Sequence, residues 1–323
     1  MLKQITKPIH KEIKIFDEKY KESLSSDVKL ILTISSYILK NPGKRIRPIL
    51  ILLVAKLLGE VNEKTYSSCI LMELLHTATL IHDDVVDDAS FRRGHFSVNN
   101  LWKNKIAVLV GDFLLSKGLS LGLKDGDLNI LLYTSKAVER ISEGEIFQLQ
   151  KSRDLDISEE DYYNIIQRKT GSLFGCCFQL AAISNNISSK EEIKNLYNIG
   201  LKIGMIFQIK DDILDYKSSS ITGKIMGNDL KESKINLPLL FTIKKVSFLK
   251  RQKIFRILRD NKINREDIYY IKKLVKINKG IEMAIKKMES LEKEIISHLK
   301  NYPESIYKRS LIDLIHFILV RKK

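Results

Sequence analysis

Apolar residues recur every three or four positions along nearly all of this 323-residue chain, which is the spacing of amphipathic α-helices. Strict alternation of apolar and polar residues, the pattern of a half-buried strand, is almost absent. The spacing predicts helices over residues 3–22, 26–40, 49–59, 65–89, 98–123, 127–150, 158–184 and 188–216. Residues 217–235 are rich in glycine and serine and predict a loop, and four or five shorter helices are expected from Leu237 onward. We therefore expect an all-α protein.

Composition supports a single folded domain. Apolar residues make up 44% of the chain, which is ample for a core, and 5 prolines with 15 glycines are too few for a loop-rich all-β protein. No stretch resembles a linker long enough to divide the chain. We therefore expect one domain over residues 1–323.

The chain is basic, with 55 Lys and Arg against 39 Asp and Glu and a net charge of +16. Such a charge can indicate binding to nucleic acid or to a membrane surface. The basic residues are interpreted as spread along solvated helix faces, without a concentrated basic arm or interleaved aromatic residues. No recognisable nucleic-acid-binding module is present, so we do not expect nucleic acid as a partner.

The cysteines and the apolar segments favour a cytoplasmic, soluble protein. Cys69, Cys176 and Cys177 form no metal-binding spacing, and an odd number cannot pair completely in disulfides, so they are predicted to be reduced core residues. The first residues lack the uninterrupted apolar run of a signal peptide. The apolar stretch Ile49–Leu58 is broken by Lys56 and is too short to span a bilayer, so no transmembrane segment is expected.

Two stretches share the pattern Asp-Asp-x-x-Asp inside apolar helical surroundings. Asp83, Asp84 and Asp87 form the first carboxylate cluster, and Asp211, Asp212 and Asp215 form the second. Residues i and i+4 lie on one face of a helix, and residue i+1 lies about 100° round the axis. Carboxylates this close repel each other, and ligation by oxygen alone favours a hard cation such as Mg²⁺. One such pattern is common on solvated helix faces, but two in apolar surroundings favour a magnesium site.

Cationic residues lie near both clusters in the sequence. They are Lys44, Arg47, Arg92, Arg93, Lys169, Lys224 and Lys234. Carboxylates combined with Arg and Lys suit a Mg²⁺-bound polyphosphate, because the metal neutralises some phosphate oxygens and the cations neutralise the others. The chain has no G-x-x-x-x-G-K-[ST] loop, which argues against an ordinary P-loop nucleotide enzyme.

An ordered set of motifs resembles the trans-isoprenyl (polyprenyl) diphosphate synthases, and especially their bacterial long-chain branch, typified by octaprenyl diphosphate synthase. The motifs are GKRIRP, HTATLIHDDVVDDASFRRG, VGDFLL, EGEIFQL, KTGSLF, FQIKDDILDY and GNDLKESKINLPLL. The resemblance implies a single large helical bundle of the isoprenoid synthase type with a central active-site cavity, and a homodimer. It implies a Mg²⁺-dependent prenyltransferase that condenses isopentenyl diphosphate repeatedly onto an allylic diphosphate such as farnesyl diphosphate, making a quinone side chain.

The resemblance also assigns roles to residues. The six aspartates of the two clusters are implied to hold Mg²⁺ ions on the allylic diphosphate. The isopentenyl diphosphate pocket is implied to contain Lys44, Arg47, His76 and Arg93. The allylic diphosphate is implied to contact Arg92, Lys169, Lys224 and Lys234. Thr170 and Gln208 would direct oxygen atoms at the developing carbocation, and the released diphosphate would take the final proton.

Some residues of the motifs have no settled role. Phe207 is either an aromatic face near the carbocation or a core residue. Glu143 and Glu145 match a family motif without a chemical step, and Asp112 is interpreted as structural. The chain also has Ser-Lys-Ile-Asn at 233–236 where the family commonly has Gly-Lys-Pro-Thr, which puts the reach of Lys234 in doubt.

Three alternatives remain open. A terpene cyclase also ionises a diphosphate, but it usually pairs one Asp-Asp-x-x-Asp with a different metal motif and lacks the isopentenyl pocket. A catalytically silent regulatory subunit would tend to lose one cluster. The same chemistry could also give a heptaprenyl, nonaprenyl or shorter product.

The residues upstream of Asp83 are expected to set the product length. In the family, a bulky aromatic residue four or five positions before the first aspartate stops growth at short products. Here those positions are Thr79 and Ala78, followed one and two turns back by Leu75 and Met72. Eleven residues of helix without an aromatic plug span about 16 Å. We therefore expect a long product, with octaprenyl favoured.

Replacing Ala78 with Tyr is predicted to shorten the product, because the phenol ring would block the path of the growing chain. Chromatography of the dephosphorylated products measures this. An unchanged product length would show that this helix does not set the length.

Overall fold

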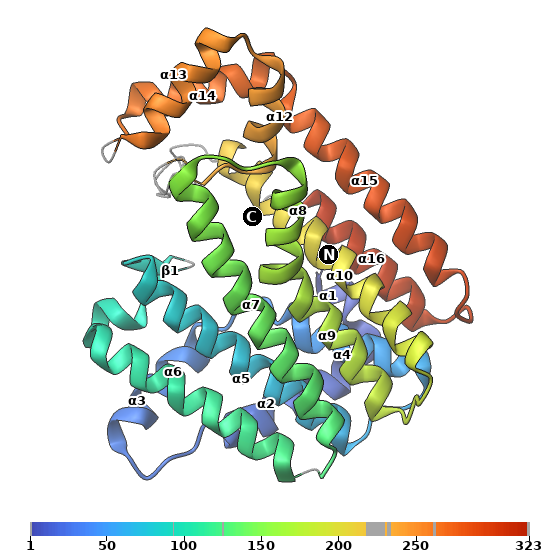
Figure 1. Cartoon of the computed structure of the whole chain (residues 1–323). Coiled ribbons are helices and arrows are strands. Elements are labelled where there is room, and N and C mark those ends of the chain that lie inside the picture. The colour runs from blue at the N-terminus through green and yellow to red at the C-terminus, as the bar shows by residue number, and fades with distance from the viewer. Residues whose placement is uncertain are drawn as a thin grey trace. The chain divides into compact units, whose positions relative to one another are not determined.

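The computed structural model describes residues 2–92, 94–124, 126–217, 230, 234–260 and 263–321. Within these ranges nearly all regular structure is helical, and the all-α expectation is confirmed (Figure 1). The chain divides into two compact units, each built from three stretches of sequence. The expectation of one domain over residues 1–323 stays a prediction.

The first unit comprises residues 1–135, 176–196 and 303–311. Its elements are α1 (Leu2–Ile5), η1 (Lys7–Ile9), α2 (His10–Ser23), α3 (Lys29–Lys40), α4 (Ile46–Leu58), α5 (Glu63–Val86), β1 (Phe91–Arg92), β2 (His95–Phe96) and α6 (Val98–Lys124). Helix α5 packs along α6 and also contacts α2 and α4 (Figure 1). Helix α4 is apolar all round, as its sequence ILILLVA requires, and is buried on nearly every side.

The second unit comprises residues 136–175, 197–302 and 312–323. Elements wholly inside it are α8 (Glu159–Ile166), the π-helix η2 (Gln167–Gly171), α12 (Leu237–Lys245), α13 (Phe248–Arg259), α14 (Arg265–Ile277) and α15 (Gly280–Leu299). Four helices contribute residues to both units: α7 (Leu128–Asp154), α9 (Ser172–Ser184), α10 (Lys190–Lys217) and α16 (Ile306–Val320). Within this unit α12 packs against α14 and α15.

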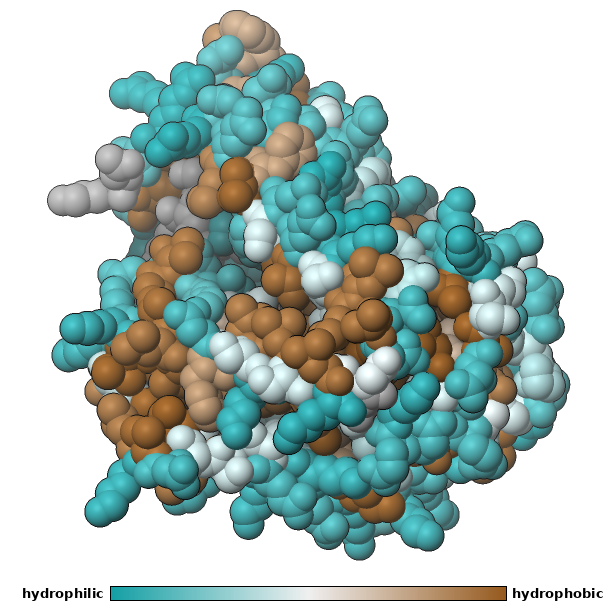
Figure 2. All heavy atoms as spheres, turned by 60° about the horizontal axis from the view of Figure 1, so that its bottom comes forward, coloured by the Kyte–Doolittle hydropathy of each residue, from teal (hydrophilic) through white to brown (hydrophobic). Residues whose placement is uncertain are grey.

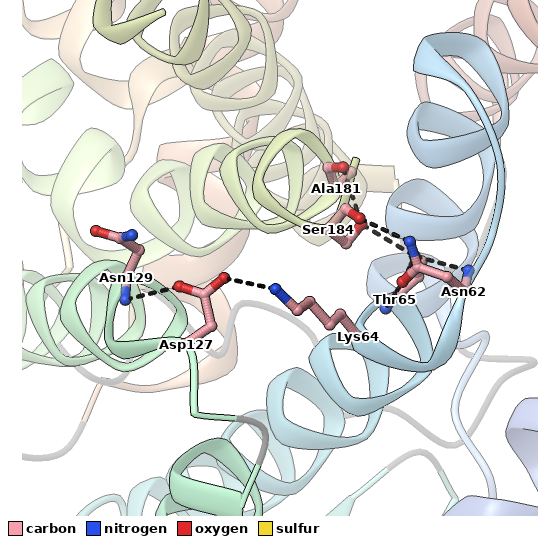
Figure 3. Close-up of polar contacts among 7 residues, drawn as sticks. All are labelled: Asn62, Lys64, Thr65, Asp127, Asn129, Ala181 and Ser184. Atoms are coloured by element: carbon pink, nitrogen blue, oxygen red, sulfur yellow. Dashed lines mark hydrogen bonds and ion pairs between the residues drawn. The ribbon is translucent and has the colours of Figure 1, made fainter. Parts of the chain in front are cut away.

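Helix α5 is anchored at its first turn, at the end opposite the first carboxylate cluster. Asn62 caps the helix and forms a reciprocal capping box with Thr65. The Thr65 hydroxyl donates to Ser184 Oγ at 3.0 Å, and the Asn62 amide donates to the Ser184 carbonyl at 2.7 Å (Figure 3). Lys64 pairs with Asp127 at 3.2 Å in the same view. These contacts fix the axial position of a helix about 36 Å long, from 24 residues at 1.5 Å each.

The structure differs from the predicted elements at two places near the candidate site. The helix predicted over 158–184 is divided into α8, η2 and α9, with a π-helical turn at Lys169-Thr170-Gly171. The predicted helix 65–89 ends at Val86, and a short hairpin follows, in which Phe91 stacks on Phe96 with ring centroids 4.7 Å apart. Most of the loop predicted at 217–235, with Lys224, lies outside the described residues.

One described helix, α6, is long and apolar enough by length and composition alone to cross a membrane, which differs from the expectation. Two observations bear on whether α6 spans a membrane. Helix α6 is interrupted at Lys103, where φ is 71°, and one side of it packs on α5. Four leucines and one valine of α6 are exposed.

The three cysteines are free and fully buried, as predicted for core residues. Burial raises the pKa of the Cys176 thiol to about 12 and the pKa values of Cys69 and Cys177 above their usual range. Their thiols are therefore neutral and unreactive in the folded protein.

Candidate functional site

The first carboxylate cluster lies at the C-terminal end of α5. Asp83 and Asp84 belong to the last turn, and Asp87 follows as the C-cap with its N–H donating to the Asp83 carbonyl at 2.8 Å. The expected i, i+4 relation between Asp83 and Asp87 is therefore present. Asp83 is half-buried, Asp87 is exposed, and the Asp84 side chain is buried, with only 3% of the residue exposed.

The buried Asp84 is held by the segment that follows it. Arg92 Nε in β1 donates to Asp84 Oδ1 at 2.7 Å. The side-chain amide of Asn99 donates to the Asp84 carbonyl at 3.1 Å. Arg92, expected to contact the allylic diphosphate, thus also binds the middle aspartate of the cluster. Arg93 lies outside the described residues.

The motif VGDFLL makes a notch for His82, the residue before the cluster. A Cβ atom on Gly111 would lie 2.1 Å from His82 Nε2, so only glycine leaves space for the ring. Nε2 lies 3.2 Å from the Val108 carbonyl and 3.6 Å from Asp112 Oδ1. Asp112 therefore lies beside the histidine that precedes the cluster, and its structural role stays a prediction.

The loop that carries Lys44 and Arg47 is held by Arg45, whose role the sequence did not reveal. Arg45 has a left-handed conformation, with φ 50°, and begins α4. Its guanidinium lies 5.5 Å from the Phe16 ring centroid and 5.7 Å from that of Tyr20, and it pairs with Asp17. Burial lowers the pKa of Arg45.

The residues that flank Arg45 are the expected diphosphate ligands. Lys44 is exposed, and Arg47 is half-buried in the first turn of α4. Helix α2, through the three side chains that hold Arg45, therefore determines how Lys44 and Arg47 are presented. His76, the third described residue of the expected pocket, is half-buried in the middle of α5.

The second carboxylate cluster lies near the end of α10 in the second unit. Asp212 is buried and accepts three hydrogen bonds, although only one of the donors, Gln208, lies on its own helix. The Tyr162 hydroxyl donates to Oδ2 at 2.6 Å, the Leu237 N–H donates to Oδ2 at 3.3 Å, and Gln208 Nε2 donates to Oδ1 at 3.1 Å. These donors offset part of the free-energy cost of burying the carboxylate.

Asp211 and Asp215 are half-buried and have other partners. Arg321 Nη2 donates to Asp211 Oδ1 at 2.7 Å and to the Phe207 carbonyl at 3.1 Å. The Arg321 guanidinium also lies 4.0 Å from the Phe207 ring centroid. Lys272 donates to the main-chain carbonyl of Asp215 at 2.8 Å. Phe207 therefore has a cation on its ring already, and Arg321 is a contact that the motifs did not predict.

The π-helical turn η2 brings Thr170 to Gln208. A Cβ atom on Gly204 would lie 2.7 Å from Gly171 Cα, so two glycines allow α10 to cross η2 at backbone contact. At this crossing the Thr170 hydroxyl donates to Gln208 Oε1 at 2.8 Å. The two residues that were expected to act together therefore form one chain of hydrogen bonds that continues to Asp212.

The motif EGE has a structural explanation in the packing of α7 against η2. A Cβ atom on Gly144 would lie 2.9 Å from Arg168 Cβ and 3.0 Å from the Lys169 nitrogen, so glycine permits close packing of α7. Glu143 pairs with Arg168 at 2.9 Å, and Glu145 pairs with Lys169 at 2.5 Å. Glu143 and Glu145 thus hold the cations of η2, including the predicted ligand Lys169.

A hydrogen bond from α10 holds the segment that contains Lys234. Tyr216 donates to Asn236 Oδ1 at 2.7 Å, and Asn236 caps α12. Asn236 stands where the family commonly has threonine, and it holds the segment of Lys234 to the helix of the second cluster. Lys234 itself is half-buried.

The donor set fits a metal ion that binds together with a phosphate ligand. Among the described residues, no three Asp, Glu, His or Cys side chains form a ready-made metal site. Mg²⁺ commonly binds through one or two carboxylates plus substrate phosphates and water. Asp83, Asp87, Asp211 and Asp215 are half-buried or exposed, although Asp211 also pairs with Arg321. Asp84 and Asp212 are buried and accept hydrogen bonds from protein donors.

The residues expected to set product length lie along α5. Met72, Leu75 and Ala78 are buried, with Ala78 only 2% exposed, and Thr79 is half-buried. Their effect on product length stays a prediction.

Comparisons with known proteins agree with the motifs. Residues 28–276 match the family described as Polyprenyl synthetase. The octaprenyl diphosphate synthase of Escherichia coli (strain K12) is 41% identical over 220 residues, 68% of each chain. The all-trans-nonaprenyl-diphosphate synthase (geranyl-diphosphate specific) of Rhodobacter capsulatus is 42% identical over 240 residues, 73% of each chain.

A solved structure agrees over the whole chain. The polyprenyl synthase from Caulobacter crescentus CB15, complexed with calcium and isoprenyl diphosphate, superimposes with a TM-score of 0.93 and 28% identity, covering 100% of this chain and 98% of the other. The predicted family and the helical fold are both confirmed. The chain therefore belongs to the polyprenyl synthetase family and is a prenyltransferase.

Proposed function

We propose that this protein is a long-chain trans-polyprenyl diphosphate synthase that condenses isopentenyl diphosphate onto an allylic diphosphate such as farnesyl diphosphate. The observation that carries the proposal is the presence of two complete Asp-Asp-x-x-Asp clusters, each with its middle aspartate fixed by protein donors. A silent regulatory subunit would have no need to keep both. Octaprenyl is the proposed product, supplying a quinone side chain, although relatives of similar identity are named for octaprenyl and nonaprenyl products.

The six aspartates divide two tasks in this proposal. Asp83, Asp87, Asp211 and Asp215 would hold Mg²⁺ ions, which supply Lewis-acid stabilisation to a departing diphosphate. Asp84 and Asp212 hold the ends of α5 and α10 in place. Lys44, Arg47, His76 and Arg93 would bind isopentenyl diphosphate. The allylic diphosphate would be bound by Arg92, Lys169, Lys224 and Lys234.

Thr170 and Gln208 would stabilise the carbocation that forms when the allylic diphosphate ionises. Thr170 and Gln208 present oxygen atoms, whose partial negative charge stabilises a developing positive charge. The isopentenyl double bond attacks the cation, and the released diphosphate takes the proton. No described side chain has to act as a dedicated base.

The decisive experiment is an elongation assay with farnesyl diphosphate, labelled isopentenyl diphosphate and Mg²⁺. We expect label in a ladder of longer products that ends at octaprenyl, and none when the metal is chelated. Asp87→Asn should lower kcat about 100-fold, the scale of losing one electrostatic contact to developing charge. Asp88→Asn is the matched control, since Asp88 is exposed and lies outside the pattern. Absence of elongation, or a cyclic product from farnesyl diphosphate alone, would refute the proposal.

The role of Asp212 can be tested through its buried donor. Tyr162→Phe removes one of the three hydrogen bonds to a buried carboxylate and should lower the free energy of unfolding by about 1–3 kcal/mol. The matched control is Tyr163→Phe, which loses a bond to the less buried Glu159 and should cost about 0.5 kcal/mol. Urea denaturation measures both, and equal losses would contradict the structural role of Asp212.

Arg45 is predicted to be a positioning residue for the isopentenyl site. Arg45→Gly keeps the left-handed backbone available but removes the guanidinium that contacts the Phe16 and Tyr20 rings. We expect the KM for isopentenyl diphosphate to rise about tenfold, equivalent to about 1.4 kcal/mol, while the KM for the allylic diphosphate stays constant. The control is Lys279→Gly, at the left-handed residue that begins α15. Equal changes in both KM values would indicate a general loss of stability instead.

We further propose a homodimer formed through α6. Leu101, Val108, Leu109, Leu119 and Leu123 are exposed on this helix. Figure 2 shows the molecule with the bottom of Figure 1 brought forward, which is the region where α6 runs. Apolar side chains gather on the face seen in this view. Large exposed apolar areas in a single chain mark interaction surfaces.

Sedimentation equilibrium tests the dimer. The expected mass is twice 37.3 kDa, and Leu109→Glu combined with Leu123→Glu should yield monomers. Leu249→Glu, on an exposed residue of α13, is the control. A wild-type protein that sediments as a monomer would refute the interface.

The cytoplasm is the proposed location. Free, buried cysteines are the usual state in a reducing compartment. Cell fractionation tests this, and recovery of the protein from the cell exterior would contradict it.

A further inference from the structure

The positive charge of the chain is concentrated in one segment, contrary to the interpretation that it is evenly spread. Residues 244–279 contain 13 Lys and Arg against 3 Asp and Glu, a net charge of +10 out of the +16 of the whole chain. The segment covers the end of α12, all of α13 and α14, and the residues before α15. Between Lys244 and Arg259 there is no acidic residue at all.

The cations of α13 point into solvent. They are Lys250, Arg251, Lys253, Arg256 and Arg259, and every one is exposed. Among the described residues, none of these five makes an ion pair with a carboxylate. Arg251 and Lys253 instead lie over the rings of Phe255 and Tyr270, at 5.4 and 4.2 Å from the ring centroids. Carboxylates of the described residues therefore do not neutralise their charge.

Large apolar side chains are exposed among these cations. Phe248 and Leu249 begin α13 with 71% and 80% of their surface exposed. On α14, Tyr269 and Ile277 are 71% and 63% exposed. The opposite sides of both helices are buried through Ile254, Ile257, Leu258, Ile268, Ile271, Leu274 and Val275. The exposed apolar residues are therefore additional to those that stabilise the fold.

Cations and apolar residues share one face of each helix. On α13, Leu249, Lys253 and Arg256 follow each other at spacings of four and three residues, which places them on one side. On α14, Tyr269 and Lys273 are four residues apart in the same way. The contact between Lys253 and Tyr270 links the two helices. We call the exposed sides of helices α13 and α14 together the α13–α14 surface.

We propose that the α13–α14 surface docks this protein on an anionic lipid bilayer. Helices with a basic polar face and exposed Phe and Leu lie in membrane interfaces, where the cations contact acidic headgroups and the apolar side chains enter the acyl boundary. Single-stranded nucleic acid would be bound by stacking aromatic platforms along a groove. The aliphatic Leu249 and Ile277 suit lipid better.

This inference does not depend on the proposed function, because it rests only on charge and exposure. Where both hold, a docked enzyme would release its long apolar product directly beside a bilayer.

Vesicle flotation in the absence of substrate tests the docking. The wild-type protein should float with vesicles of phosphatidylglycerol and phosphatidylcholine in equal amounts, and should not float with phosphatidylcholine alone. The combined change Lys253→Gln, Arg256→Gln and Arg259→Gln should weaken binding about 100-fold, since each cation near an anionic surface contributes about tenfold or less. Phe248→Ser with Leu249→Ser keeps the charge and should make the remaining binding disappear at moderate salt.

The matched control changes three exposed lysines of α15 and its C-cap, by Lys286→Gln, Lys293→Gln and Lys300→Gln. It removes three charges as well and should leave binding within about twofold of wild type. Circular dichroism and elongation activity without vesicles should be unchanged in every variant. Equal weakening by both triple changes would show that net charge alone drives binding and would overturn the proposal. Binding to a single-stranded DNA probe without binding to anionic vesicles would also overturn it.

Discussion

A buried carboxylate is tolerated only when hydrogen-bond donors surround it, and this constraint organises both carboxylate clusters. Asp84 and Asp212 occupy the same place in the two Asp-Asp-x-x-Asp patterns, and both side chains are buried. Asp84 accepts a hydrogen bond from Arg92. Asp212 accepts hydrogen bonds from Tyr162, Gln208 and the Leu237 N–H. Each middle aspartate is therefore turned inward and fixed, whereas the aspartates at the first and last positions are half-buried or exposed.

Close packing at glycine explains motifs that the chemistry alone leaves without a role. Gly144 lets α7 approach η2, so the two glutamates beside it reach Arg168 and Lys169. Gly111 similarly receives the ring of His82. In both cases a side chain that would fill the notch would displace a residue next to a proposed ligand. These glycines are therefore part of the site even though they present no chemical group to it.

The helices, the two clusters and the family could be predicted from sequence, because each depends on periodicity or on residues that are close together in the chain. The inward turn of Asp212 could not, since its strongest donor, Tyr162, is 50 residues away. The same holds for Arg321 on Asp211, which are 110 residues apart. The role of Arg45 could not be predicted for another reason. Arg45 has a left-handed backbone at the start of α4, and sequence indicates this conformation only where glycine or asparagine occurs. The charge concentration at 244–279 was visible in the sequence and was overlooked.

The three donors to Asp212 also determine how this part of the protein forms. They come from α8, α10 and the start of α12, separated from Asp212 by 50, 4 and 25 residues. The chain segments of 50 and 25 residues between Asp212 and two of its donors must close before the carboxylate can be buried without a large free-energy cost. Contacts between residues distant in sequence form slowly. We therefore expect this region to be among the last to consolidate during folding. Its three helices then open and close together as a single cooperative unit, because none of them can leave without exposing the charge that the other two enclose.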